Sequence, residues 1–195
     1  MKEFEFKYIV DQSTFCDLID KIKTQYPNVI PKSKVQVNYY YDTDNYDLHK
    51  QGVTCRIRLS EKGMIGQYKE HYRDDSHCSQ ETEFAVNELP KTIMIHDTTL
   101  LFQGELVTQR ISFLVTPFVK IECDTNYYWG NCDYEIEIEY EDGYFDDAKQ
   151  IADSLMLKDN NNDNTSQDQE LTPEVPIIAP EIVDDNRDKK EIKDS

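Results

Sequence analysis

Charged residues recur at every second position through much of this chain, and they recur in blocks of one sign. Residues 3–8 read EFEFKY, residues 55–59 read CRIRL, and residues 134–140 read YEIEIEY. Side chains of a β-strand point alternately to opposite sides, so each segment predicts a strand with one charged face and one apolar face. A sheet built from such strands has one charged surface and one apolar surface, and the fold must accommodate both.

The alternation predicts eight strands. They lie near residues 2–8, 34–42, 53–60, 65–72, 80–87, 106–115, 118–126 and 132–141. Eight strands with short connections favour an antiparallel sheet that closes, or nearly closes, on itself. Trp129, Gly130 and Asn131 mark the turn of the last hairpin.

Three helical patterns interrupt the strands. Ser13 is a candidate N-cap for a helix that ends before Pro27, and a weaker pattern runs from about Pro90 to Phe102. A third places Ala148, Ile151, Ala152 and Leu155 on one stripe. The predicted fold is therefore mainly β (α+β), a closed barrel with flanking helices.

The charge of the chain excludes some partners and separates a tail from the folded part. The 195 residues include 39 acids and 21 Lys or Arg, a formal charge of -18. We expect no nonspecific binding to nucleic acid or anionic membranes, because both need a basic surface. Residues 159–195 hold polar, acidic and proline-containing sequence and no aromatic residue. We therefore expect one domain over residues 1–158 and a disordered acidic tail over 159–195.

The sequence also indicates a compartment. The sequence contains no apolar run long enough to predict a membrane-spanning helix. The charged N-terminus MKEFEFKYIV lacks the apolar core of a secretion signal. The five cysteines show neither a CxxC pair nor metal-ligand spacing. Reduced thiols in a cytoplasmic protein are the expectation.

The direction of the charged face decides the function. For any single strand, charge facing water is the ordinary interpretation. It explains several strands together less well, because water-facing sheets usually mix signs and like charges opposite one another destabilise pairing. If the charged face looks into a closed barrel, the lumen needs a ligand that answers both signs. A metal-bound oligophosphate does so, since divalent cations suit carboxylates and phosphates suit Arg and Lys.

Three blocks in order resemble a known family. Glu3-x-Glu5-x-Lys7 resembles the ExExK signature of the CYTH domain, the triphosphate tunnel metalloenzyme superfamily. VNYYYDTDNYDLHKQGVTCRIRL and IECDTNYYWGNCDYEIEIE resemble its middle and closing blocks. The resemblance covers about residues 1–158, and the small single-domain bacterial branch looks closest. It implies an eight-stranded antiparallel barrel that forms a tunnel, with Mg²⁺ or Mn²⁺ as cofactor.

The resemblance also implies roles for individual residues. The expected metal-side carboxylates are Glu3, Glu5, Asp124, Glu135 and Glu137, with Glu81 and Glu83 as a further pair that binds metal or positions water. The cations expected to hold the phosphate chain and stabilise the leaving group are Lys7, Arg56, Arg58, Lys69 and Arg110. Lys120 is either a compensating substrate cation or a solvent-exposed lysine, and Glu139 serves either the metal or the barrel rim. One departure is Gln80, where the family often has a basic residue.

These observations predict a divalent-metal-dependent phosphohydrolase that removes the terminal phosphate of a linear triphosphate, with inorganic tripolyphosphate first. In the expected arrangement one metal lies on Glu3, Glu5 and Glu137, and a second lies near Asp124 and Glu135. Thiamine triphosphatase, nucleoside triphosphatase and class IV adenylyl cyclase stay open, as does a noncatalytic barrel that binds polyphosphate or a nucleotide. The oligomeric state is left open.

Overall fold

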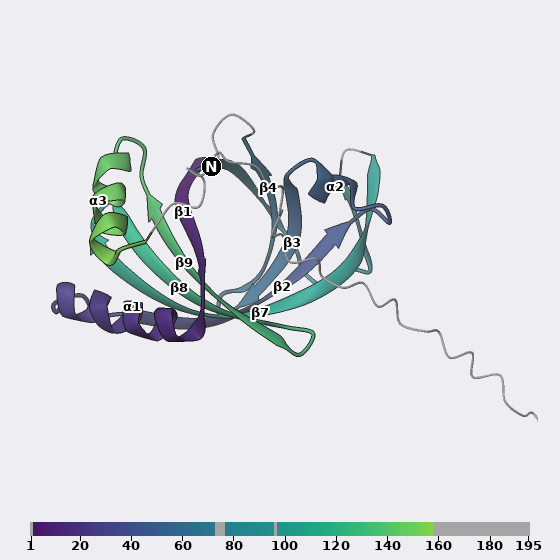
Figure 1. The fold of residues 1–195 in the computed structure, drawn as a ribbon. Coiled ribbons are helices and arrows are strands. Elements are labelled where there is room, and N and C mark those ends of the chain that lie inside the picture. Colours follow the sequence, from purple (N-terminus) through teal and green to yellow (C-terminus); the bar gives the residue numbers. More distant parts are fainter. Residues whose placement is uncertain (1, 73–76, 96, 158–195) are drawn as a thin grey trace, which may run out of the picture. The chain divides into compact units, whose positions relative to one another are not determined.

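Eight antiparallel strands close into a barrel in the computed structural model, which describes residues 2–72, 77–95 and 97–157. The described residues form nine strands in all, and the ninth, β6, pairs with β7 outside the ring. The strands are β1 (Lys2–Val10), β2 (Lys32–Asp42), β3 (Val53–Ser60), β4 (Gly63–His71), β5 (Cys78–Ala85), β6 (Thr92–Ile95), β7 (Thr98–Thr116), β8 (Val119–Tyr128) and β9 (Asn131–Tyr140). Their order is β2-β3-β4-β5-β1-β9-β8-β7-β6, and an additional pairing of β7 with β2 completes the ring. Figure 1 shows the ring of strands end-on, along the barrel axis. The predicted closed barrel is confirmed.

The weak helix predicted from Pro90 to Phe102 is wrong. This segment forms β6, a turn at Asp97 with φ 64°, and the first part of β7. Its residues include several β-branched side chains, which pack well on a pleated surface. Ile93 and Leu100 face each other across the hairpin and are buried, so tertiary burial outweighs the local helical pattern.

Helix α1 (Gln12–Gln25) begins before the predicted cap. Asp11 is the N-cap, and its carboxylate accepts a 2.9 Å hydrogen bond from the backbone N–H of Thr14. The N-cap prediction of Ser13 is therefore wrong, because the aspartate two residues earlier satisfies the first free N–H groups of the helix.

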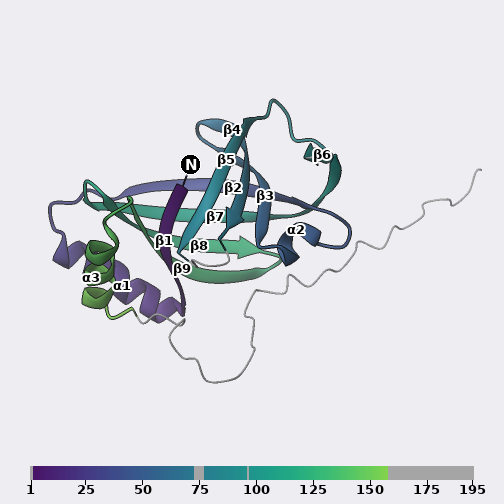
Figure 2. The same ribbon diagram turned by 90° about the horizontal axis from the view of Figure 1, so that it is seen from above.

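The larger apolar core lies outside the barrel. The outward residues of β1, β7, β8 and β9, such as Phe6, Phe113 and Ile138, are covered by α1 and by α3 (Phe145–Leu155). Figures 1 and 2 show both helices against this side of the ring. The predicted stripe of α3 faces this core, and Ala148 is fully buried in it.

A second apolar cluster covers another part of the outer surface. Tyr41, Cys55 and Ile57 from β2 and β3 pack there with Ile93 and Leu100. Beside it runs the short helix α2 (Asp47–Lys50), which the sequence analysis did not predict. With apolar side chains packed outside the wall, the alternate side chains of every strand are left for the interior.

Three further expectations concern the tail, membrane-spanning helices and the cysteines. The predicted acidic tail, 159–195, lies outside the described residues, so the division at 158 stays a prediction. Within the described ranges, none of the helices is long and apolar enough to cross a membrane. All five cysteines are free thiols.

A core residue on α1 tests the position of the larger core. Ile22 is fully buried, so Ile22→Ala should lower the free energy of unfolding by about 2–5 kcal/mol. Denaturant unfolding measures this, with the exposed Asp17→Ala on the same helix as the matched control, expected within about 0.5 kcal/mol of the wild type. Equal effects of the two substitutions would contradict a core between α1 and the barrel.

Candidate active site

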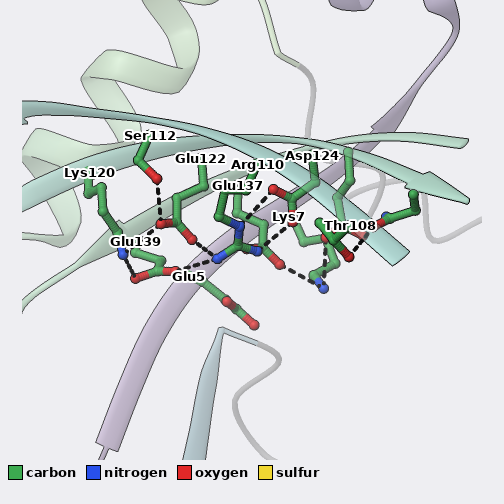
Figure 3. A network of polar contacts seen from close by, with 12 residues as sticks. Glu5, Lys7, Thr108, Arg110, Ser112, Lys120, Glu122, Asp124, Glu137 and Glu139 are labelled. Atoms are coloured by element: carbon green, nitrogen blue, oxygen red, sulfur yellow. Dashed lines mark hydrogen bonds and ion pairs between the residues drawn. The ribbon is translucent and has the colours of Figure 1, made fainter. Parts of the chain in front are cut away.

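The inner face of the barrel is lined by charged and amide side chains. On each strand these residues alternate with the outward apolar ones described above. Carboxylates come from β1, β5, β8 and β9, and cations come from β1, β2, β3, β4, β7 and β8. Figure 3 shows part of this network, with side chains of different strands converging on one another. The strand order makes β2 and β3 lie opposite β1 and β9 around the ring.

Two carboxylate clusters on one side of the lumen have the geometry to hold metal ions. Glu5, Glu137 and Glu139 form the first, and Asp124, Glu135 and Glu137 form the second. Within each cluster the candidate ligand oxygens lie within 4.8 Å of one another. All donors are carboxylate oxygens, which are the ligands that Mg²⁺ and Mn²⁺ prefer. The residues therefore fit a divalent cation of this type, and Glu137 belongs to both clusters.

Arg110 is the centre of the charge network. Its Nε donates to Asp124 at 2.7 Å, and its Nη2 lies 2.7 Å from Glu137. The guanidinium also contacts Glu122 and is 3.8 Å from Glu139. Burial alone would lower the pKa of Arg110, but Glu137 and Asp124 outweigh it and raise the pKa. One permanently charged side chain thus neutralises members of both carboxylate clusters.

Lys7 plays a similar part on β1. Its ammonium lies 3.0 Å from Glu137 and 3.2 Å from Glu135. Burial works against the charged form of Glu137, but Lys7 and Arg110 hold its pKa well below the usual value. Burial, together with the nearby charge of Glu137, raises the pKa of Glu135 to about 8.

Lys69 and Arg56 form ion pairs with other predicted metal-side carboxylates. Lys69 on β4 lies 2.8 Å from Glu5 and 3.2 Å from Glu3. Arg56 on β3 lies 3.6 Å from Glu81. Glu3 therefore stands with Lys69 and not with Glu137, and Glu81 stands beside the cations of β3. Neither belongs to a carboxylate cluster of the described residues.

The amide of Gln67 links Glu83 to this side of the lumen. Its nitrogen lies 2.9 Å from Glu81 and 3.3 Å from Glu83. Lys120, for which two roles were open, lies 2.7 Å from Glu139 and 2.9 Å from Glu122. It is thus part of the inner network, at the edge next to Arg110.

The opposite wall carries positive charge with weaker compensation. Arg58 donates to the amide oxygen of Asn38 at 2.9 Å, a neutral acceptor. Burial, followed by repulsion from Arg56 and Arg110, lowers the pKa of Arg58 to about 10. Lys34 on β2 is half-buried, and burial with repulsion from Arg110 and Arg58 lowers its pKa to about 8. Repulsion among these cations favours an anionic ligand between them.

Sequence reasoning missed Lys34 and gave Glu122 no role in the site. Lys34 lies two and four residues before the inward Gln36 and Asn38, so period-2 counting along β2 could have found it. The same counting places Glu122 on the charged face of β8 with Lys120 and Asp124, but its contact with Arg110 joins residues of two strands and does not follow from that pattern. Gln36 adds a further polar group, and its buried amide oxygen has no hydrogen-bond partner among the described residues.

Removing the Arg110 guanidinium should make the stability of the folded protein depend more strongly on bound metal. Arg110→Met takes the guanidinium away from Glu122, Asp124 and Glu137, which costs about 3–5 kcal/mol. Lys120 and Lys7 still face Glu122 and Glu137 in the variant. Thermal unfolding with chelator and with Mn²⁺ measures the effect. We expect Mn²⁺ to stabilise this variant more than it stabilises the wild type, because the ion replaces the lost charge.

The matched control is Arg58→Met on the opposite wall, whose side-chain acceptor is the neutral Asn38. Its stability should respond to Mn²⁺ as the wild type does. A response of Arg110→Met no larger than that of the control would exclude the carboxylates around Arg110 as a metal site.

The chain is similar in sequence and in fold to known proteins. A family model described as CYTH domain matches residues 1–166. A candidate adenylate cyclase from Bacillus halodurans is similar in structure, with TM-score 0.60, 22% identity, and coverage of 81% of this chain and 92% of the other. No curated protein matches this sequence.

Two further solved structures share the fold. A candidate adenylyl cyclase from Hippeastrum, described as having a dominant triphosphatase activity, has TM-score 0.57 and 15% identity, covering 80% of this chain and 88% of the other. The capping-enzyme triphosphatase of Mimivirus has TM-score 0.56 and 10% identity, with the same coverage of 80% and 88%. At these identities the likeness is one of fold.

Proposed function

Because the chain belongs to the CYTH domain family, we propose that it is a divalent-metal-dependent phosphohydrolase that removes the terminal phosphate of a linear triphosphate. The observation that carries the proposal is the division of the lumen. Two carboxylate clusters lie on the side of β1, β8 and β9, and cations with a neutral or distant partner lie on β2 and β3 across the ring. A purely anion-binding barrel has no use for the carboxylate clusters.

Inorganic tripolyphosphate is the first candidate substrate. Its phosphate oxygens can bind the cations of the lumen. It also binds divalent cations, which the carboxylate clusters can hold. Any triphosphate with an organic group shares this chain, so the tripolyphosphate moiety is the part that the charged lumen itself would recognise. The proposed cofactor is Mg²⁺ or Mn²⁺, and the proposed location of the protein is the cytoplasm.

The chain's own residues supply positioning and charge. A bound divalent ion would supply charge neutralisation and an activated water. Glu5, Glu137 and Glu139 would hold one ion, with Asp124 and Glu135 completing a second site beside Glu137. Phosphoryl transfer needs chiefly positioning and neutralisation of charge, so no Ser, Cys or His nucleophile is required.

The cations would hold the phosphate chain from two directions. Arg56, Arg58 and Lys34 face it from β2 and β3. Lys7 and Arg110 neutralise carboxylates in the metal-free protein. A bound ion would supply that neutralisation, and Lys7 and Arg110 would then be free to contact the phosphate oxygens and to stabilise the charge that develops on the leaving group.

A phosphate-release screen tests the proposed function. Tripolyphosphate, pyrophosphate, ATP and thiamine triphosphate are offered with Mg²⁺ and Mn²⁺ in turn, and with chelator. We expect orthophosphate and pyrophosphate from tripolyphosphate in metal only. Cyclic AMP with pyrophosphate from ATP would assign a cyclase instead, and tight binding without turnover in either metal would assign a noncatalytic binder.

A single amide substitution tests the metal side. Glu5→Gln keeps the size of the side chain and removes its charge, so kcat should fall on the order of 100-fold, as when one preorganised charge-stabilising group is lost. Steady-state phosphate release measures it. The control is Glu105→Gln, at an exposed position of β7, which should leave the rate unchanged. Near-wild-type turnover of Glu5→Gln would remove this residue from the metal site.

Lys34 gives the proposal a pH signature. With a pKa of about 8 in the free protein, Lys34 is charged below that pH and neutral above it. The value of kcat/KM for tripolyphosphate should therefore fall as pH rises through about 8, since this profile reports the free enzyme. Lys34→Met should lose this limb and raise KM about 10-fold at pH 7, the worth of a charged hydrogen bond. An identical descending limb in the variant would exclude Lys34 from substrate binding.

A further inference from the structure

The register of the strands gives the predicted lumen cations two kinds of partner. Four of the six cations lie directly opposite a carboxylate on a neighbouring strand, namely Lys7 with Glu137, Lys69 with Glu81, Arg110 with Asp124 and Lys120 with Glu139. The two arginines of β3 differ, because Arg56 lies opposite Gln67 on β4 and Arg58 lies opposite Asn38 on β2. Both of these partners are neutral amides. Neither arginine has a carboxylate directly across from it on β2 or β4.

Both amides hold their arginine by the same nitrogen. Nε of Arg56 donates to Oε1 of Gln67 at 2.9 Å, and Nε of Arg58 donates to Oδ1 of Asn38 at 2.9 Å. Gln67 is 5% exposed and Asn38 is 2% exposed, so bulk water competes little for these bonds. A neutral acceptor satisfies the N–H group without cancelling the positive charge. The two Nη nitrogens of each guanidinium, which can bind phosphate oxygens as a fork, are not used by the amides.

Gln67 also keeps Arg56 apart from the acids of β5. Its amide nitrogen donates to Glu81 at 2.9 Å and to Glu83 at 3.3 Å. An amide has one acceptor oxygen and two N–H donors, so a flipped Gln67 would set donor against donor at Arg56 and oxygen against oxygen at both carboxylates. Nη2 of Arg56 stays 3.6 Å from Glu81, beyond hydrogen-bond distance. The amide thus stands between the arginine and the acids in place of a close ion pair.

We propose that Gln67 and Asn38 are positioning residues that hold Arg56 and Arg58 with their charge uncompensated, so that these two arginines bind phosphate in the absence of divalent metal. The inference rests on the proposed function and deepens it. The cations of the opposite wall are already paired with carboxylates in the free protein. The arginines held by amides need no such exchange of partners before a phosphate chain can bind them.

Binding without metal tests the proposal. Calorimetry measures the Kd of inorganic tripolyphosphate for the full chain in excess chelator. We expect the wild type to bind, and Gln67→Met and Asn38→Leu each to raise Kd about tenfold, since each loses one hydrogen bond to a charged group. The matched control is Gln109→Met at an exposed position of β7, which should leave Kd unchanged. No binding by the wild type in chelator, or an unchanged Kd in both amide variants, would overturn the proposal.

A double-mutant cycle separates positioning from a merely structural role. Without the amide of Gln67, Arg56 should close onto Glu81 and lose its availability for phosphate. Removing the charge of that acid should cancel the effect. In the Glu81→Gln background, Gln67→Met should therefore change Kd by no more than about twofold, the scatter of independent effects. An equal effect of Gln67→Met in both backgrounds would mean lost packing only and would overturn the role of Gln67.

NMR of the wild type keeps the proposal falsifiable if the amide variants fail to fold. Nitrogen-15 spectra of the arginine side chains, assigned with Arg56→Lys and Arg58→Lys, report the Nε–H groups. We expect both to exchange slowly with water and to remain protected when tripolyphosphate is added in chelator, because the amides keep hold of Nε. Exchange as fast as that of free arginine, or loss of protection on binding, would overturn the proposal.

These outcomes are distinct from a failure of the proposed function. Binding in chelator that depends on both amides, without turnover in Mg²⁺ or Mn²⁺, upholds the positioning residues and rejects the hydrolase. Turnover with metal, with no binding in chelator, upholds the hydrolase and overturns the positioning residues. If tripolyphosphate binds neither with metal nor with chelator, both proposals fail.

Discussion

Opposite charges that compensate one another inside a closed barrel are the interaction on which this structure depends. An unpaired charge taken out of water costs several kcal/mol, so an inner wall of carboxylates folds only when cations meet them. Arg110 and Lys7 do this for Glu137, and Lys69 does it for Glu5. In the proposed function the same cations would exchange carboxylates for phosphate oxygens when metal ions bind. One set of contacts would then serve both the stability of the free protein and the binding of a metal-bound triphosphate.

This interior is possible because the apolar cores are outside it. The helices α1 and α3 cover the outer side of β1, β8 and β9, and a second cluster covers β2 and β3. Hydrophobic burial therefore stabilises the wall from without, while its inner face stays free for charge. The arrangement fixes the direction of every functional side chain, since each lies one residue away from an anchored apolar neighbour.

Much of this could be predicted from the sequence, because period-2 alternation assigns each residue to a face before any strand is paired. Which carboxylates meet is a matter of register between strands distant in sequence, so the association of Glu139 with Glu5, and of Glu3 with Lys69, could not be foreseen. The helix predicted from Pro90 to Phe102 was wrong because the same segment carries both a helical apolar stripe and β-branched residues. The second apolar cluster buries part of this segment as strands.

The central claim is that metal and triphosphate share the lumen between the two charged walls. Crystals grown with Mn²⁺ and a non-hydrolysable triphosphate analogue test it, because the anomalous signal of manganese locates each ion without reference to the rest of the density. The account predicts manganese within bonding distance of Glu137, with phosphate oxygens against Arg58 and Lys34. Ions and phosphates bound only on the outer surface of the barrel, with the pairs of Arg110 and Lys7 intact within, would contradict it.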